Sequence, residues 1–254
     1  MNLSNHDVII GQNMFESSST QKHPLGTRGV DAGGRVYRYV LNGAVDLIAG
    51  TCIQSSAVVA GHQTLAVHTT SQVAIGGSAI TVTCASSAAA NYYSEGWLMI
   101  ASGAGAGFQY QLDTHAAVST GAVGLFPFYT PSDTNTYVTA ITTTSTVTLV
   151  ANPYRNVIVV PATTATGLVV GVATYVITAA QYGWIQTWGV CAVQASGAFA
   201  IGAMLNGIAA TSGQTLFISS PAVTACSIVG QYIGQAYQTG AAVTWTATYL
   251  KISP

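Results

Sequence analysis

The residues that could do chemistry are few, and their spacing forms no recognised catalytic or metal-binding set. Zinc sites and zinc-dependent hydrolases use patterns such as H-x-x-x-H and H-E-x-x-H, and none of the histidines fits either one. The histidines are His6, His23, His62, His68 and His115. The glycine-rich segment 102–108 lacks the third spacing of a dinucleotide fingerprint, so we interpret it as a turn between two strands.

Carboxylates and thiols add little. Glycoside cleavage needs two carboxylates around the scissile bond, and after residue 46 the only acids are Glu95, Asp113 and Asp133. Asp113 and His115 would share one face of an extended segment, but no G-x-S-x-G elbow marks a nucleophile. The four cysteines form no C-x-x-C pair, so we expect buried free thiols. These are Cys52, Cys84, Cys191 and Cys226. We therefore predict a protein that is not an enzyme and binds no cofactor or metal.

Charge is the unusual quantity in this chain of 254 residues. Charged residues make up 5% of the sequence, against roughly 25% in ordinary soluble domains. Eight of the thirteen charges lie in residues 1–46, and none lies between residues 156 and 250. A body with so few charges must either expose hydroxyl and amide groups to water or be buried against other protein. We favour burial against other protein, with exposure of hydroxyl and amide groups to water contributing.

The same composition excludes several partners. A net charge of −1 gives no cluster of Lys and Arg for phosphate contacts, so we expect no nucleic acid. Thr, Ser, Gly and Gln interrupt the apolar residues, leaving no run of about 18 that could cross a membrane as a helix. The N-terminus shows no secretion signal, so we expect synthesis in a cytoplasm and no membrane partner.

The segment YGWIQTWG, residues 182–189, contains the most informative strand pattern. In an extended chain Tyr182, Trp184, Gln186 and Trp188 share one face, and such large rings must be covered. That face belongs either in the core or at a subunit contact, where Trp and Tyr are enriched.

The closing segment 243–252 alternates in the same way. Trp245 and Tyr249 lie on one face and threonines on the other, and we assign these two rings to the core or to a trimer interface as well.

Segment 26–40 differs from the rest because cations and aromatic rings alternate along it. Arg35, Tyr37 and Tyr39 would share one face of a strand and Arg38 the other, while Arg28 precedes them. An edge strand with solvated arginines is one interpretation, and a contact strand that pairs with acidic groups on a partner is the other.

Short β-type segments run through the rest of the chain without a convincing amphipathic helix. This pattern predicts an all-β fold, a sandwich or barrel-like body of short antiparallel strands with an extended N-terminal arm. We expect an arm over residues 1–40, a first β-rich domain over 41–150 and a second over 151–254. The expected strands are 45–53, 64–68, 79–85, 97–101, 107–112, 138–150, 156–160, 168–178, 181–188, 190–194, 199–204, 215–219, 227–235 and 243–252.

Several local patterns occur together: GTRGVDAGGRVYRYV at 26–40, SEGWLMIASGAGAGFQYQLDTH at 94–115, NPYRNV at 152–157, GLVVGVATYVITAAQYGWIQTWG at 167–189, and the aromatic C-terminal strand. Together they resemble the head decoration, or cement, proteins of tailed bacteriophages. The resemblance implies β-rich subunits, commonly homotrimers, that bind the outside of an assembled capsid and reach over neighbouring major capsid proteins with an extended arm. It implies no catalytic residue and a location on the outer surface of the virion.

On this basis we expect a structural protein that stabilises a capsid by bridging its major capsid proteins. Arg28, Arg35, Tyr37, Arg38 and Tyr39 are the expected capsid contacts. A trimeric receptor-binding or head-fibre module that recognises a host glycan is the main alternative. An ice-binding surface, suggested by TTTSTVT at 142–148, is weaker because the regular repeats of such an array are missing.

Overall fold

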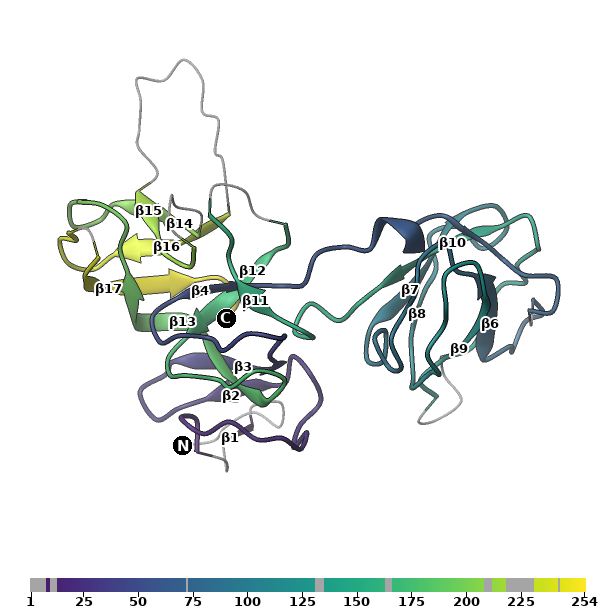
Figure 1. Cartoon of the computed structure of the whole chain (residues 1–254), viewed down its shortest axis with the longest axis horizontal. Helices are drawn as coiled ribbons and strands as arrows, with labels where there is room; N and C mark the ends of the chain where they lie inside the picture. The colour runs from purple at the N-terminus through teal and green to yellow at the C-terminus, as the bar shows by residue number, and fades with distance from the viewer. Residues whose placement is uncertain are drawn as a thin grey trace, which may run out of the picture. The chain divides into compact units, whose positions relative to one another are not determined.

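The computed structural model describes residues 8–9, 13–71, 73–130, 135–162, 166–207, 212–217, 231–241 and 243–254. Within them the chain is nearly all β-structure, with one short 3-10 helix at Ala60–His62, which confirms the all-β prediction. The chain forms two compact units (Figure 1). Unit 1 comprises Met1–Ala57 and Pro153–Pro254, and unit 2 comprises Val58–Asn152.

This division differs from the expected boundaries at residues 40 and 150 because of one strand early in the chain. Strand β4, Cys52–Gln54, pairs with β11, Ile158–Val159, and with β12, Val169–Ala173. The chain therefore completes part of the unit 1 sheet before it enters unit 2, and it returns to the same sheet afterwards. Unit 2 is an insertion between β4 and β11.

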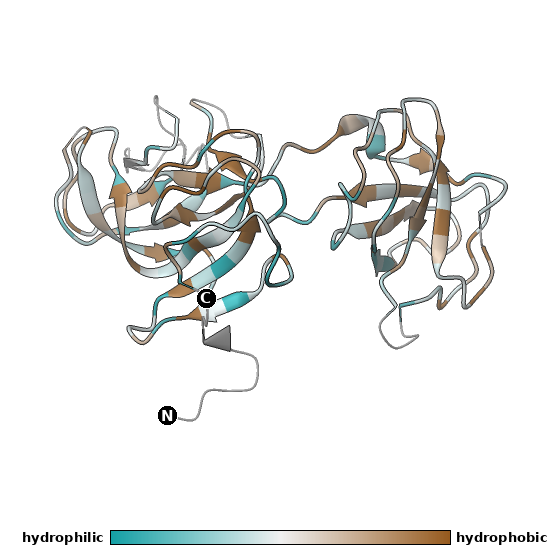
Figure 2. Ribbon diagram, turned by 60° about the horizontal axis from the view of Figure 1, so that its bottom comes forward, coloured by the Kyte–Doolittle hydropathy of each residue, from teal (hydrophilic) through white to brown (hydrophobic). Residues whose placement is uncertain are grey.

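Unit 1 is built on a curled, mostly antiparallel sheet that forms a half-barrel. Its strand order is β1-β2-β3-β13-β17-β16-β14-β15, with β12 also pairing with β13. The remaining strands are β1 Val8–Ile9, β2 Arg28–Val30, β3 Val36–Leu41, β13 Tyr182–Gln194, β14 Met204–Asn206, β15 Leu216–Phe217, β16 Tyr232–Ala236 and β17 Trp245–Lys251. Figure 2 shows mainly brown and pale strands, in line with the low share of charged residues.

Strand β13 is the centre of this sheet. It is one continuous strand, although the sequence predicted two, at 181–188 and 190–194. A β-bulge interrupts it, because Gln186 pairs with Tyr37 whereas Trp188 pairs with Val36. Neighbouring residues of β3 point to opposite faces, so Trp188 lies on the face opposite to Trp184. The expectation that both tryptophans share a face was wrong, because the bulge inserts one extra residue between them.

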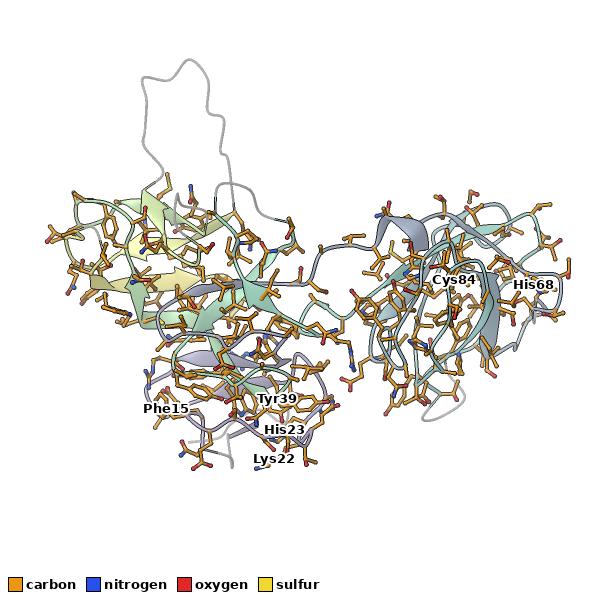
Figure 3. All side chains as sticks on the ribbon, in the orientation of Figure 1. Phe15, Lys22, His23, Tyr39, His68 and Cys84 are labelled. Carbon is orange, nitrogen blue, oxygen red and sulfur yellow. The ribbon has the colours of Figure 1, made fainter. Side chains whose placement is uncertain are left out.

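Residues 18–25 cover the aromatic face of β13 and β3, so this part of the expected arm packs against the sheet. Trp184 and Tyr39 are buried with their ring centroids 5.1 Å apart, and the His23 ring packs against both. Figure 3 shows His23 beside Tyr39. The backbone N–H of Lys22 donates to the Tyr39 hydroxyl at 3.0 Å, and Ser18 bridges to Tyr182. Two large rings need cover from water, and this segment supplies it.

Unit 2 packs a four-stranded sheet, β5-β10-β7-β8, and a two-stranded sheet, β6-β9, around one hydrophobic core. The strands are β5 Leu65–Ala66, β6 Ala79–Thr83, β7 Trp97–Ser102, β8 Gln109–Gln111, β9 Val123–Pro127 and β10 Thr146–Val150. The turn predicted at 102–108 is confirmed, since it joins β7 to β8. Strand β9 was not predicted.

Candidate docking surface

Strand β17 presents its aromatic residues outward and its threonines inward. Thr246, Thr248 and Leu250 are buried, whereas the side chain of Trp245 is 55% exposed and that of Tyr249 is half-buried. The Thr246 hydroxyl donates to the Val193 carbonyl at 3.2 Å, which satisfies its polar group in the core. Trp245 is therefore not a core residue, although the sequence allowed that position for it.

Neighbouring strands extend this aromatic row into a continuous outer face. Val190 of β13 and Gln235 of β16 pair with Tyr249, and Met204 of β14 pairs with Gln235. Cross-strand partners point to the same side of a sheet. We define the outer face as Trp188, Val190, Ala192, Met204, Gln235, Trp245, Ala247, Tyr249 and Lys251, with Tyr237 at its margin.

The outer face is apolar and accessible, with a single ionic side chain. Val190, Met204 and Tyr237 are 44%, 48% and 66% exposed. Lys251 donates from Nζ to Gln235 Oε1 at 3.1 Å. Single exposed apolar residues are ordinary, but a contiguous apolar patch with Trp and Tyr in it is typical of an interaction surface.

A pocket of about 410 Å³ opens beside this face, within unit 1. The outer-face residues Val190, Ala192, Trp245 and Ala247 form one side of it. The remaining lining residues are Phe15, Arg35, Ala49, Gly50, Thr174, Gln186, Cys191, Gln238 and Thr246.

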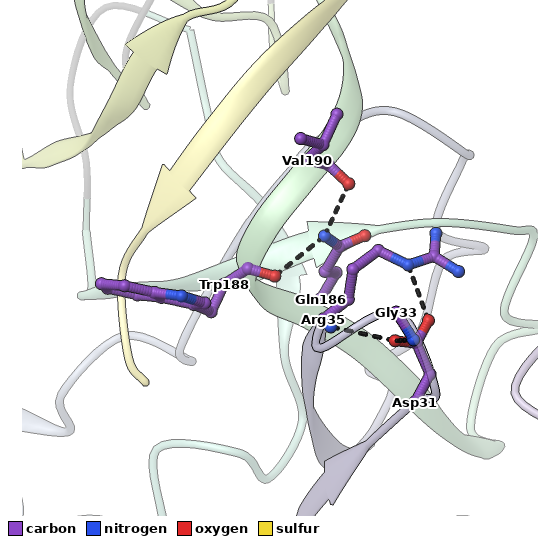
Figure 4. A network of polar contacts seen from close by, with 6 residues as sticks. All are labelled: Asp31, Gly33, Arg35, Gln186, Trp188 and Val190. Atoms are coloured by element: carbon purple, nitrogen blue, oxygen red, sulfur yellow. Dashed lines mark hydrogen bonds and ion pairs between the residues drawn. The ribbon is translucent and has the colours of Figure 1, made fainter.

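Gln186 is fully buried at this pocket and stabilises the bulge of β13 (Figure 4). Its Nε2 donates to the Trp188 carbonyl at 3.0 Å and to the Val190 carbonyl at 2.9 Å. Within the described part of the chain its Oε1 has no hydrogen-bond partner, and the same is true of the buried Thr174 hydroxyl. Leaving a buried polar atom unsatisfied costs about 1–3 kcal/mol, so these two atoms lower the stability of the fold.

The ionisable groups at the pocket do not form a reactive centre. Burial raises the pKa of the Cys191 thiol to about 12, so it stays protonated and unreactive near neutral pH. Burial is the largest influence on the pKa of Arg35 and lowers it, but the hydrogen bond to Asp31, 2.7 Å from Nε to Oδ2, and the electrostatic attraction of Tyr37, Asp31 and Cys191 together outweigh burial and leave the pKa raised. Figure 4 shows this pair next to Gln186.

The five residues expected to contact a capsid lie on or next to β2 and β3, with Arg35 directly before β3, but most of their contacts are within the chain. Tyr37 and Tyr39 are fully buried. Arg38 donates to Ser253 Oγ at 2.9 Å and to the Gly26 and Pro254 carbonyls. Arg35 pairs with Asp31, and Arg28 is half-buried. The two tyrosine rings are thus not available to a partner.

The residues assigned to the core or an interface divide between the core and the outer face. Trp184 lies in the core beside half-buried Tyr182, whereas Trp188 packs edge-on against Tyr249 with ring centroids 5.9 Å apart. Sequence reasoning missed Met204, Val190 and the pocket residue Gln186. The alternation of 190–194 was the available signal for Val190, but the bulge that sets its direction left no mark in the sequence.

Unit 2 holds a buried histidine pair with a structural role. His62 Nδ1 forms a hydrogen bond with the Tyr93 hydroxyl, and His62 Nε2 donates to the Ser86 carbonyl at 2.8 Å. His115 Nε2 accepts the Tyr93 N–H at 3.0 Å. Both nitrogens of each ring are occupied by structural partners, since His115 Nδ1 also bonds the Ala116 carbonyl at 2.8 Å. Asp113, expected on the same face, accepts instead from the Thr114 N–H.

Among the described residues no group of His, Cys, Asp and Glu is arranged to hold a metal ion. Cys52, Cys84 and Cys191 are buried free thiols as predicted, while Cys226, His6 and Asp133 lie outside the described residues. No helix in the described ranges is long and apolar enough to cross a membrane. No protein-family model, curated protein or solved structure matches the chain.

Proposed function

We propose that this chain is a structural protein that attaches to the outer surface of a tailed-bacteriophage capsid and bridges neighbouring major capsid proteins. The observation that supports this most directly is the outer face of β13, β17, β16 and β14, an exposed apolar surface with two tryptophans and two tyrosines on or beside it. The sequence resemblance supplies the class of partner, and the outer face supplies a means of attachment.

The charge distribution favours a lasting protein contact. Burying an unpaired charge at an interface is costly, and the outer face holds only Lys251, which already bonds Gln235. The face can therefore be covered without stranding an ion. By contrast, Arg35, just before β3, and Arg38, on β3, are engaged within the chain, so we assign attachment to the outer face in preference to β2 and β3.

A capsid-binding experiment with charge-introducing variants tests this proposal. Purified chain is added to capsids of the parent phage assembled without it, and occupancy is measured by co-sedimentation. Met204→Asp and Tyr237→Asp place an anion on or beside the outer face, and we expect each to lower affinity by about 10-fold or more, because a buried, unpaired carboxylate costs more than 1.4 kcal/mol.

Val176→Asp is the matched control, because Val176 is 54% exposed in the β12–β13 connection and is not one of the outer-face residues. It is expected to bind as the parent chain does. Equal occupancy for all four proteins would contradict the assignment of the outer face. Absence of binding by the parent chain would contradict capsid attachment itself.

We also propose that the chain is a homotrimer. Light scattering of the purified chain is expected to give three times 26.0 kDa. If Tyr237→Asp or Met204→Asp converts the trimer to monomer, the outer face is the subunit contact and a different surface faces the capsid. If the variants remain trimeric, the face is free for the capsid.

A further inference from the structure

Unit 2 places two aromatic rings on either side of a glutamine amide, on the outer surface of its larger sheet. Trp97 of β7 pairs with Gln111 of β8. An antiparallel bridge joins Leu112 to Phe128, and the Tyr129 N–H donates to the Gln111 carbonyl at 2.9 Å. Gln111 therefore lies opposite Tyr129. The three residues form one row in the order Trp97, Gln111, Tyr129.

This row points away from the core and is accessible from solvent. Alternation places it on the side opposite to Leu98 and Phe128, which are buried in the unit 2 core. The side chain of Trp97 is 38% exposed and that of Tyr129 is 47% exposed, with half-buried Gln111 between them. A ligand can reach both rings and the amide without any rearrangement of the sheet.

The neighbouring row repeats the combination of apolar and amide groups. Met99 of β7 is 45% exposed, and it pairs with exposed Gln109 of β8 and with half-buried Thr148 of β10. Cross-strand partners point to the same side of a sheet. We define the unit 2 face as Trp97, Met99, Gln109, Gln111, Tyr129 and Thr148.

The amides of the unit 2 face are available to a ligand. Among the described residues, neither Gln109 nor Gln111 uses its side-chain amide in a hydrogen bond. Each amide offers an acceptor oxygen and two N–H donors. Asn135 holds the backbone in place, because its Nδ2 donates to the Gln111 carbonyl at 2.7 Å and to the Tyr129 carbonyl at 2.9 Å. A row with a fixed spacing binds at a lower entropy cost.

The charge of unit 2 favours a neutral ligand. Residues 58–152 contain no lysine or arginine, and their acids are Glu95, Asp113 and Asp133. Asp113 follows Gln111 by two residues, and its N–H donates to the Pro127 carbonyl at 2.9 Å, so it lies at the end of the unit 2 face. An anionic ligand would meet this carboxylate and no cation to balance it.

We infer that the unit 2 face binds a neutral glycan chain. A pyranose has an apolar C–H face that can lie on an aromatic ring, and its hydroxyls can both donate to and accept from an amide. Trp97 and Tyr129 lie two strands apart, roughly 10 Å, so they contact different sugar residues of one chain. A wholly apolar partner would leave the amides of Gln109 and Gln111 unpaired, which is costly.

This inference does not rest on capsid attachment. The unit 2 face and the outer face belong to different units, so their variants separate the two proposals. Met204→Asp, on the outer face, is expected to keep glycan binding. Tyr129→Ala is expected to keep capsid occupancy.

The test is calorimetric titration of the full chain with neutral hexasaccharides, namely maltohexaose, cellohexaose, mannohexaose and chitohexaose. Hexagalacturonic acid is the charged comparison, and the monosaccharide of each neutral chain is the short comparison. At least one neutral hexasaccharide is expected to bind, more tightly than its own monosaccharide and more tightly than hexagalacturonic acid.

Single substitutions then assign the binding to the unit 2 face. Tyr129→Ala removes one ring and is expected to weaken binding about 10-fold. Gln111→Ala removes the amide between the rings and is expected to weaken it about 5-fold. Tyr237→Ala is the matched control, because it removes an exposed tyrosine ring from unit 1. It is expected to bind as the parent chain does.

Trp97→Ala is expected to abolish binding, with circular dichroism recorded to verify that unit 2 is folded. If this variant fails to fold, the results for Tyr129→Ala and Gln111→Ala decide. Absence of heat with every neutral hexasaccharide would overturn the inference. Tighter binding of hexagalacturonic acid, or equal binding by Tyr129→Ala and the parent chain, would overturn it as well. If Tyr129→Ala dissociates the oligomer, the unit 2 face is a subunit contact and the inference is wrong.

Discussion

Strand β10 of unit 2 and strand β17 of unit 1 have almost the same type of sequence and opposite orientations. In β10, Val147 and Leu149 are buried while Thr146 and Thr148 point outward. In β17 the threonines are buried and the aromatic residues point outward. Alternating threonine and apolar residues therefore define two faces, but they do not say which face meets the core.

Leu250 and the neighbouring strand explain the orientation of β17. Leu250 is fully buried and shares its face with Thr246 and Thr248. Buried Cys191 and Val193 of β13 pair with those threonines. A threonine contributes a methyl group to a core and can donate its hydroxyl to a nearby carbonyl, so this face is compatible with burial. The large rings are then left on the outer face.

The largest expected effect comes from placing a charge on the threonines of the two strands. Thr248→Asp places a carboxylate at a fully buried position, and we expect it to destabilise unit 1 by about 4 kcal/mol. Thr148→Asp changes a half-exposed side chain that accepts one bond from the Thr64 N–H, and about 1 kcal/mol is expected. Urea unfolding followed by circular dichroism measures both. Similar losses at the two sites would show that the faces are not opposite.

Alkaline pH tests the buried aromatic face of unit 1. Burial raises the pKa of Tyr37 from 10.0 to about 12. Below pH 10 both folded and unfolded chains keep this proton, so the stabilisation is fully present there. Above pH 10 the unfolded chain releases the proton first, and up to about 3 kcal/mol is lost by pH 12.

Tyr37→Phe isolates this contribution. In the described structure the Tyr37 hydroxyl has no hydrogen-bond partner, so the variant is expected to fold normally and to resist alkaline unfolding better than the parent. Tyr237→Phe, at an exposed position, serves as the control. Urea unfolding between pH 9 and pH 12 provides the comparison, and identical pH profiles for Tyr37→Phe and the parent would contradict the burial argument.

The smallest expected effect is a difference in stability between variants of the two inward threonines of β17, Thr246 and Thr248. Thr246→Val removes the hydrogen bond to the Val193 carbonyl and is expected to cost about 1 kcal/mol. Thr248→Val removes a buried hydroxyl that lacks a partner among the described residues, and it is expected to be neutral or stabilising. Thermal unfolding measures the difference, and a larger loss for Thr248→Val would reverse the assignment of the two hydroxyls.

The β-class and many strands could be predicted because β-branched and aromatic alternation is a local property. The turn at 102–108 followed from its glycines, and Gly103, Gly105 and Gly107 do adopt positive φ. The insertion of unit 2 could not be predicted, because the pairing of β4 with β11 joins residues about a hundred positions apart. Nothing in a local pattern specifies such a partner.

In the candidate site, too, local sequence patterns identified residues, whereas the tertiary structure decided where they lie. Tyr182, Trp184, Trp188, Trp245 and Tyr249 were recognisable as residues that need a surface to cover them. The bulge at Gln186 then placed Trp184 in the core and Trp188 on the outer face. Gln186 lines the pocket, with its amide held by two carbonyls of its own strand.

Composition and alternation, read from the sequence alone, determined an all-β chain that is poor in charge and has threonines and large rings on opposite faces of its last strand. Only the tertiary structure decided which of those faces is buried, where unit 2 is inserted and which tryptophan reaches the surface. The physical reason is that strand periodicity is set by neighbouring residues, whereas direction relative to a core is set by pairing with distant strands and by single insertions such as a β-bulge.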